Sequence, residues 1–401
     1  MPDVKFIPPQ LNPWLARILQ LFFPLAVSLG YKLQVKVDPV EVPRLKAIAD
    51  QRVVYLPNHS NLDDGIALFI LSARLGQLFN YVVALEAFRG WIAKLLQTMG
   101  AYSIRRGVGD RPSIVQTLKI LQQPQCKLVI FPEGGCSYQN ATVMPFRPGA
   151  FELSFKALAK LVNHNSDPNS VPDFYLVPLS LKYTYPDATE EDLDSALTRL
   201  ETELSITPQQ DVYERLRFIS LQILTSLEKE YQVDVPPPTE IDYRIKLLKQ
   251  EMLNYCETQL NLSPPKQLAN RERVYRVQAT LRSIDDSDKV ASVNYQHLYL
   301  TTVRLLNFDA IYDGYVAENP TLERFFDTID RLEREVFQCD RPKFKGRREI
   351  VIKIASPINL KDYWQEYQSE GQSSPDNLTN KQSVVERLTQ LSQQLVQANL
   401  N

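Results

Sequence analysis

The sequence has 401 residues, 44% of them hydrophobic and 23% charged, with a formal net charge of −2. This composition is close to that of ordinary globular proteins and excludes a largely disordered chain, and the near-zero net charge gives no general attraction for nucleic acid. The four cysteines show no paired spacing and the three histidines lie far apart, so we expect neither a disulfide framework nor a metal site.

The first apolar segment, Trp14–Leu33, is rich in Leu, Ile and Phe. Its charge-free part, Ile18–Tyr31, has 14 residues, fewer than the roughly 20 that a membrane-spanning helix needs. Acidic Asp3 precedes it and no small-residue cleavage site follows, which argues against a secretory signal. The segment predicts two short apolar helices, broken at Pro24, that lie in a membrane interface. A core helix that covers a sheet is the alternative.

The run Val53–Pro57 is short and apolar, which is typical of a buried strand. The tripeptide Asn58–Ser60 follows it, and Asp64 comes five residues after His59. Open α/β sheets place their chemistry at strand ends, and a histidine oriented by a carboxylate can act as a general base. In a regular helix Asp63, not Asp64, would share a face with His59. A solvated loop pair is the alternative to a catalytic pair.

Two cations, Arg105 and Arg106, close a segment that begins at Gly100. An arginine can hold a phosphate through two parallel N–H donors. A helix is expected to begin at Asp110 or Ser113, and its N-terminus would also favour an anion. The segment therefore predicts a phosphate site, with a solvated basic turn as the alternative.

A third segment, Phe131–Ser137, follows the strand-like run Cys126–Ile130. Glu133 lies on its turn beside Gly134, and glycine lets a ligand approach the backbone closely. Farther along, Arg147 precedes an expected helix.

The next apolar run, Leu176–Leu181, contains Pro178. From residue 187 to about residue 337 helical periodicity dominates, with breaks near residues 207–208, 236–238, 263–265 and 319–320. The apolar stripes of these helices are interpreted as core faces. Strand character returns at Glu349–Ile354, and a strand this short needs sheet neighbours for its backbone groups.

Residues 368–382, rich in Gln, Ser and Asn, predict a loop before a last amphipathic helix, Val384–Val396. A basic run precedes the strand Glu349–Ile354. It could contact anionic lipid or an acidic carrier protein. A solvated face is the alternative. The run comprises Arg341, Lys343, Lys345, Arg347 and Arg348.

In this order the segments resemble the glycerophospholipid acyltransferase family, which includes the 1-acylglycerol-3-phosphate acyltransferases. The family's motifs are N-H-x-x-x-x-D, a glycine and arginine around an apolar stretch, F-P-E-G, and an apolar strand with proline. They correspond here to Asn58–Asp64, Gly100–Arg106, Phe131–Gly134 and Val177–Pro178. The resemblance covers roughly residues 45–186.

The resemblance implies an α/β fold with a central, mostly parallel or mixed sheet flanked by helices. It implies that His59 is the general base and that Asp64 orients it. It also implies an acceptor site formed by Arg106, Glu133 and Gly134, with Arg105, Arg147 and Pro178 contributing. The strand at residues 349–354 would close the same domain, so the helical stretch would be a large insertion.

The expected organisation is then four segments. They are residues 1–40, the apolar and membrane-interfacial helices; 41–186, the acyltransferase domain; 187–346, the helical insertion; and 347–401, the closing strand and C-terminal helix. Replacement of the insertion by a short linker is expected to leave a foldable core.

One position departs from the family pattern. The third motif usually continues with an arginine that helps to bind the acceptor phosphate, and this sequence has Cys136 there. A cysteine cannot form that charge-assisted fork, so the acceptor's head group stays open.

The expected reaction moves an acyl chain from an acyl thioester, carried by coenzyme A or acyl carrier protein, to the hydroxyl of a lysophospholipid. The first candidate acceptor is 1-acyl-sn-glycerol 3-phosphate, which would give phosphatidic acid; another lysolipid head group is the alternative. No further cofactor is expected, and the protein would work at the cytoplasmic face of a membrane, peripherally or monotopically. Two other classes stay open: a thioesterase or lipid hydrolase that uses Cys136 and His59, and a non-catalytic lipid-binding protein.

Overall fold

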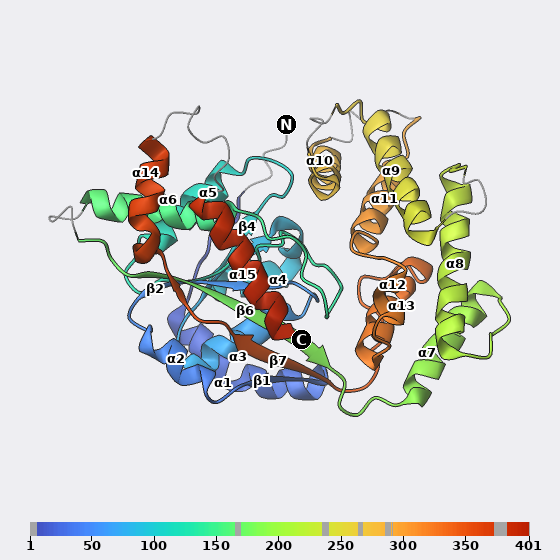
Figure 1. Ribbon diagram of the computed structural model, residues 1–401, viewed down its shortest axis with the longest axis horizontal. Helices are drawn as coiled ribbons and strands as arrows, with labels where there is room; N and C mark the ends of the chain where they lie inside the picture. The colour runs from blue at the N-terminus through green and yellow to red at the C-terminus, as the bar shows by residue number, and fades with distance from the viewer. Residues whose placement is uncertain are drawn as a thin grey trace.

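A twisted sheet forms the centre of the larger part of the molecule (Figure 1). This computed structural model describes residues 6–164, 170–234, 240–263, 268–284, 290, 292–372 and 383–400. Within those ranges the sheet has eight strands. They are β1 Leu33–Val37, β2 Arg52–Pro57, β3 Asn80–Ala84, β4 Ala101–Ile104, β5 Lys127–Val129, β6 Phe174–Thr184, β7 Arg348–Ile354 and β8 Ile358–Asn359.

The strand order is β1-β7-β6-β2-β5-β3-β4, with β8 paired to β6. All pairs are parallel except β6 with β7 and β6 with β8. The predicted fold class, a mostly parallel or mixed sheet flanked by helices and interrupted by a helical insertion, is confirmed. β2 lies between β5 and β6, so the residues that follow Pro57 leave from the middle of the sheet.

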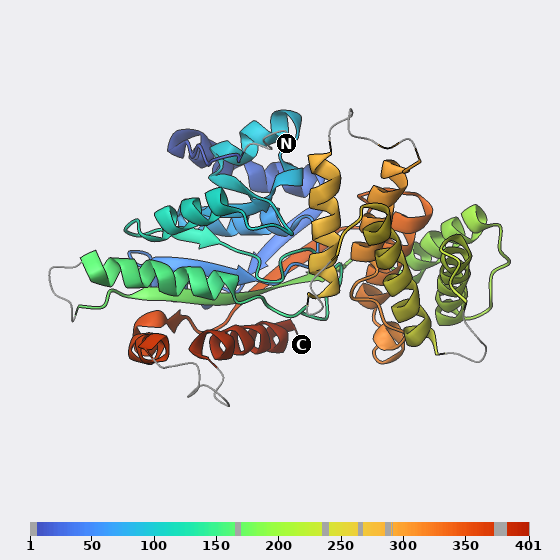
Figure 2. The ribbon, with the colours of Figure 1, turned by 90° about the horizontal axis from the view of Figure 1, so that it is seen from above.

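Side chains of β2 point alternately to two cores, as the pleat of a strand requires. Val53 and Tyr55 pack in one core, and Val54 and Leu56 pack in the other. Helices therefore cover both faces, and Figure 2 shows the sheet between them. The first core takes α1 Pro13–Gly30, α2 Glu41–Ala47, α3 Asp64–Leu75 and the end of α4 Gly90–Thr98, which follows η1 Leu85–Ala87. The second takes α5 Arg111–Leu121, α6 Gly149–His164, η3 Leu360–Tyr363, α14 Trp364–Gln372 and α15 Val384–Leu400.

The helical insertion forms a separate layer beside the sheet, coloured from yellow-green to orange in Figure 1. The predicted apolar stripes are buried in its own core, for example at Leu216, Ile219 and Met252. Two predicted breaks lie between helices, and those near residues 236–238 and 263–265 lie wholly or largely outside the described residues. The helices are α7 Glu190–Leu204, α8 Val212–Glu230, α9 Ile241–Gln259, α10 Asn270–Ser283, α11 Tyr295–Asn307, α12 Gly314–Ala317 and α13 Leu322–Val336.

After the insertion, β7 returns to the sheet that carries His59. It pairs in parallel with β1, from Leu33 opposite Arg348, and antiparallel with β6, from Leu179 opposite Ile354. Both pairings satisfy the backbone groups of a strand that begins 164 positions after the end of β6 in the sequence. The prediction that residues 349–354 join the N-terminal sheet is confirmed.

Two local predictions are wrong. The N-terminal segment is one helix, α1, that continues through Pro24. Contacts with α3 support the helix on the N-terminal side of Pro24, because Gln20 donates to Ser72 Oγ at 2.8 Å and Phe23 packs edge-on against Phe69. The predicted loop 368–382 is also too long, since residues 368–372 belong to α14 and the remaining residues, 373–382, lie outside the described residues.

Candidate active site

His59 is placed by the end of β2 and by the side chain of Asn58. The Asn58 amide accepts from Leu181 N–H at 2.7 Å and donates to Leu181 O at 3.1 Å, as a further strand residue would. The ring of His59 then lies against Phe131, with 4.3 Å between ring centroids. Its side chain is 21% exposed, so the imidazole is held firmly but can be reached from solvent.

The predicted pair of His59 and Asp64 is present. His59 Nδ1 lies 2.9 Å from Asp64 Oδ2, and Asp64 is completely buried. The same carboxylate accepts from Asn61 N–H at 2.9 Å and from the Tyr183 hydroxyl at 2.7 Å. Burial, followed by the charge of Asp64, raises the pKa of Tyr183 well above its ordinary value, so the phenol stays a donor. With Nδ1–H directed to Asp64, Nε2 is the ring nitrogen that can accept a proton.

Asp63 has a different role. It pairs with Arg341 at 2.6 Å and with Arg348 at 3.0 Å. In a regular helix Asp63 would share a face with His59, but α3 begins only at Asp64, so the chain from His59 to Asp63 is not helical. Within the predicted basic run, Lys345 likewise pairs with Glu333 at 2.8 Å and Arg347 with Asp187 at 2.9 Å. Most of that run therefore forms ion pairs within the protein, where the chain returns to the sheet as β7.

Glu133 shapes the loops around His59. Its Oε1 accepts from His59 N–H at 2.6 Å, and its Oε2 accepts from Met144 N–H at 3.2 Å. The side chain is buried, and burial raises its pKa to about 8, although these two donors and Arg271 favour the charged form. Both oxygens accept from backbone N–H groups of this chain, so Glu133 holds His59 and the segment at Met144 in place.

Gly134 is required by a close approach. Its φ of +71° lies in the left-handed region, and a Cβ there would come within 2.6 Å of the Arg147 guanidinium carbon. Arg147 in turn forms an ion pair with Glu272 of the insertion. Arg147 thus lies directly over the loop that carries Glu133.

Arg105 and Arg106 follow β4 on the neighbouring side of the site. Arg105 pairs with Asp110, which also accepts its backbone N–H at 2.7 Å. The Arg106 guanidinium carbon lies 4.4 Å from the ring centroid of Tyr275, and Nη1 donates to the Tyr275 hydroxyl at 3.1 Å. Arg147 lies 5.8 Å from the same centroid. Arginines from two separate segments of the chain therefore meet at one aromatic ring.

That ring belongs to α10, whose role the sequence interpretation missed. Figure 2 shows α10 between the sheet and the other helices of the insertion. Arg271 of this helix contacts the loop that follows Glu133. Tyr275 accepts from Arg106, and Arg282 forms an ion pair with Glu86. Their spacing of four and then seven residues puts them on one helical face, whereas Val274, Val277 and Leu281 face the insertion core. This second face, basic and aromatic, is the sequence pattern that could have indicated a contact between α10 and the rest of the site.

Pro178 lies apart from these arginines. It is buried in β6, in register with Leu56, and its carbonyl accepts from Ala355 N–H at 3.0 Å. Its place is in the sheet beneath the site, and a direct role in substrate binding stays a prediction.

Cys136 is held as a neutral thiol. Burial, followed by the charge of Asp64, raises its pKa far above the ordinary value for cysteine. Among the described residues no hydrogen bond joins its sulfur to His59. The geometry therefore gives the thiol none of the activation that a cysteine nucleophile needs.

Residues 39–182 match the model of a protein family described as acyltransferase. The matched segment contains His59, Asp64 and every predicted substrate-binding residue. It ends within β6, so the helical insertion lies outside it.

Proposed function

Since residues 39–182 form a domain of the acyltransferase family, we propose that this chain transfers an acyl group from an acyl thioester to the free hydroxyl of a lysophospholipid. The observation that carries the proposal is the 2.9 Å contact between His59 Nδ1 and the buried carboxylate of Asp64. It supports a general base whose Nε2 is directed to substrate.

The proposed step needs no covalent enzyme intermediate. His59 Nε2 removes the hydroxyl proton as the oxygen attacks the thioester carbonyl, and Asp64 stabilises the imidazolium. The new C–O bond replaces the C–S bond, and the proton returns to the departing thiolate. Bringing the two bound substrates together supplies much of the acceleration.

The acceptor's anionic group would bind where Arg106 and Arg147 flank Tyr275, with Arg105 beside them. The first candidate acceptor is 1-acyl-sn-glycerol 3-phosphate, giving phosphatidic acid for phospholipid synthesis. Cys136, a neutral thiol where the family pattern has a cation, favours a second candidate, a lysophospholipid with another head group.

The position of α1 supports a location at a membrane. By length and composition alone, the helix is apolar enough to span a membrane. It lies near the N-terminus. Its outer face is exposed, with Trp14 at 84%, Leu21 at 72% and Leu29 at 75%. Its inner face packs on α3, so we propose that it lies in the interface at the cytoplasmic face and holds the protein there peripherally or monotopically.

The test is a panel of lysolipid acceptors, incubated with purified protein and labelled acyl-coenzyme A or acyl–acyl carrier protein and read by mass spectrometry. We expect a new ester with at least one lysophospholipid and none with His59→Ala. Release of free fatty acid without ester formation from any acceptor would replace transfer with hydrolysis.

A further inference from the structure

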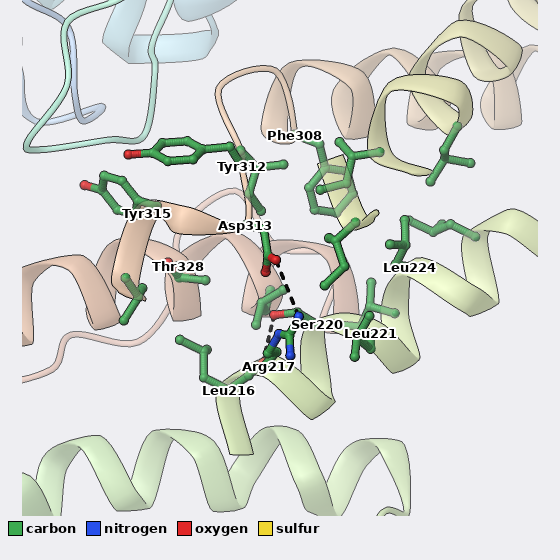
Figure 3. A pocket seen from close by; sticks show the side chains of 18 of the residues that line it. Leu216, Arg217, Ser220, Leu221, Leu224, Phe308, Tyr312, Asp313, Tyr315 and Thr328 are labelled. Carbon is green, nitrogen blue, oxygen red and sulfur yellow. Dashed lines mark hydrogen bonds and ion pairs between the residues drawn. The ribbon is translucent and has the colours of Figure 1, made fainter. Parts of the chain in front are cut away.

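The insertion contains an apolar pocket that none of the residues assigned to the proposed reaction lines. It lies between α8, α9, α12 and α13 and the segment from Phe308 to Asp313, and it encloses about 100 Å³ (Figure 3). Its surface is almost entirely apolar. Sites for small molecules often lie between the helices of a bundle and combine apolar walls with few polar groups.

The residues that line the pocket extend along two facing helices. Along α8 the lining residues extend from Tyr213 to Leu227, which is about 21 Å at the rise of an α-helix. On the facing helix, α9, they extend from Ile241 to Met252, or about 16 Å. An apolar lining that follows two helices over this length suits an extended hydrocarbon chain.

The pocket has a buried floor and a polar mouth. Leu216, Leu248 and Met252 on the floor are at most 3% exposed. At the mouth, the side chains of Arg217 and Asp313 are 48% and 38% exposed and form an ion pair of 3.4 Å, which Figure 3 shows beside Ser220. A chain inserted along α8 would leave its polar end at this mouth, in contact with water.

We propose that this pocket binds the single hydrocarbon chain of an amphiphile. Two sources share that chemistry, a free fatty acid and the acyl chain of a substrate. The substrate's acyl chain is relevant because the pocket lies close to the loop that follows Glu133. Gln139 donates to Ala310 O at 2.6 Å, next to the lining residue Ile311, and Ser137 of the same loop donates its N–H to His59 O at 2.7 Å.

Direct binding of a fluorescent fatty acid, cis-parinaric acid, to the full chain tests the proposal without depending on the proposed acyl transfer. Ser220→Phe and Thr328→Phe place a ring in the pocket from two different helices. Each variant is expected to weaken binding at least tenfold. The matched control is Ser226→Phe, an exposed position on α8 outside the pocket, which should stay within twofold of the wild type.

Circular dichroism and thermal unfolding identify which of the two filling variants is folded. Wild-type affinity for cis-parinaric acid in either folded filling variant would overturn the proposal, as would equal weakening by Ser226→Phe. His59→Ala should bind the probe normally.

A second measurement separates the two sources. If the pocket holds the substrate's chain, Ser220→Phe lowers kcat/KM for long-chain thioesters or acceptors relative to eight-carbon ones. If it holds a separate fatty acid, the chain-length profile stays that of the wild type while probe binding is lost.

Discussion

Arg271 of the insertion donates from Nη1 to the carbonyl oxygen of Gly135, 3.3 Å away, in the loop that contains Glu133. Its Nε donates to Asp309 at 2.6 Å, so the guanidinium connects the insertion core to the loop that contains Glu133. Arg331 of α13 contacts the same loop, donating to Ser137 O at 2.5 Å and to Tyr138 O at 3.2 Å. The insertion is therefore part of the catalytic domain's structure.

These contacts change what we expect when residues 187–346 are replaced by a short linker. The backbone carbonyls of Ser137 and Gly135 would lose donors, and apolar surface at Tyr185 would be exposed. We predict a poorly soluble or loosely folded product, rather than the stable core that the sequence suggested. Circular dichroism and the cooperativity of thermal unfolding measure this. A cooperative transition like that of the full chain would show that the contacts are dispensable.

Substitutions of the neighbouring aspartates should separate catalysis from stability. His59→Ala and Asp64→Asn are expected to lower kcat by about 10²- to 10⁴-fold because the general base or its orienting partner is lost. Asp63→Asn instead removes a buried charge paired with Arg348, which should lower the free energy of unfolding by about 3–5 kcal/mol. Steady-state kinetics and urea unfolding distinguish the two effects. Near-normal transfer by folded His59→Ala would end the proposed mechanism.

Cys136→Ala should retain most of the transfer activity, because burial keeps the thiol protonated. The measurement is the initial rate of ester formation, together with intact-protein mass spectrometry after incubation with thioester. An acyl adduct on Cys136 that disappears, along with activity, in the variant would support a thiol enzyme instead.

Membrane binding should depend on the outer face of α1. Replacing Leu21, Phe22 and Leu25, each more than 60% exposed, by serine removes apolar surface without touching the contacts of Gln20 and Phe23 with α3. We expect weaker co-sedimentation with liposomes and an unchanged melting temperature. Unchanged liposome binding would assign membrane contact to another surface.

Stability should fall as the pH rises through neutrality. The pKa of Glu133 is about 8 in the folded protein against an ordinary value of 4.5, so the folded state keeps a proton that the unfolded chain releases. Its contribution is therefore fully present below about pH 4.5 and is lost as the pH approaches 8. Asp327, whose pKa burial raises to about 7, acts in the same direction. Urea unfolding at pH 5, 6, 7 and 8 should show a decline that is shallower in Glu133→Gln; equal slopes would contradict the assignment.

Local patterns in the sequence were enough to predict the sheet and the contact between His59 and Asp64. The run Val53–Pro57 forms a strand because its apolar side chains fill both cores, and β7 joins the sheet because its backbone groups need partners. His59 and Asp64 are five residues apart, so a short turn after the strand suffices to bring them together. These features could be predicted because they depend on the pattern of apolar residues, or on the spacing of two residues, within one segment.

Only the tertiary structure decided the surroundings of that pair. The partners of Glu133, the stacking of Arg106 on Tyr275 and the continuation of α1 through Pro24 depend on contacts with other segments. Arg106 and Tyr275 are 169 residues apart, and Gln20 and Ser72 are 52 apart. A local pattern can mark a helical face that makes contacts, as in α10, but it does not name the partner, because the burial and charge that decide these contacts exist only after the segments have packed together.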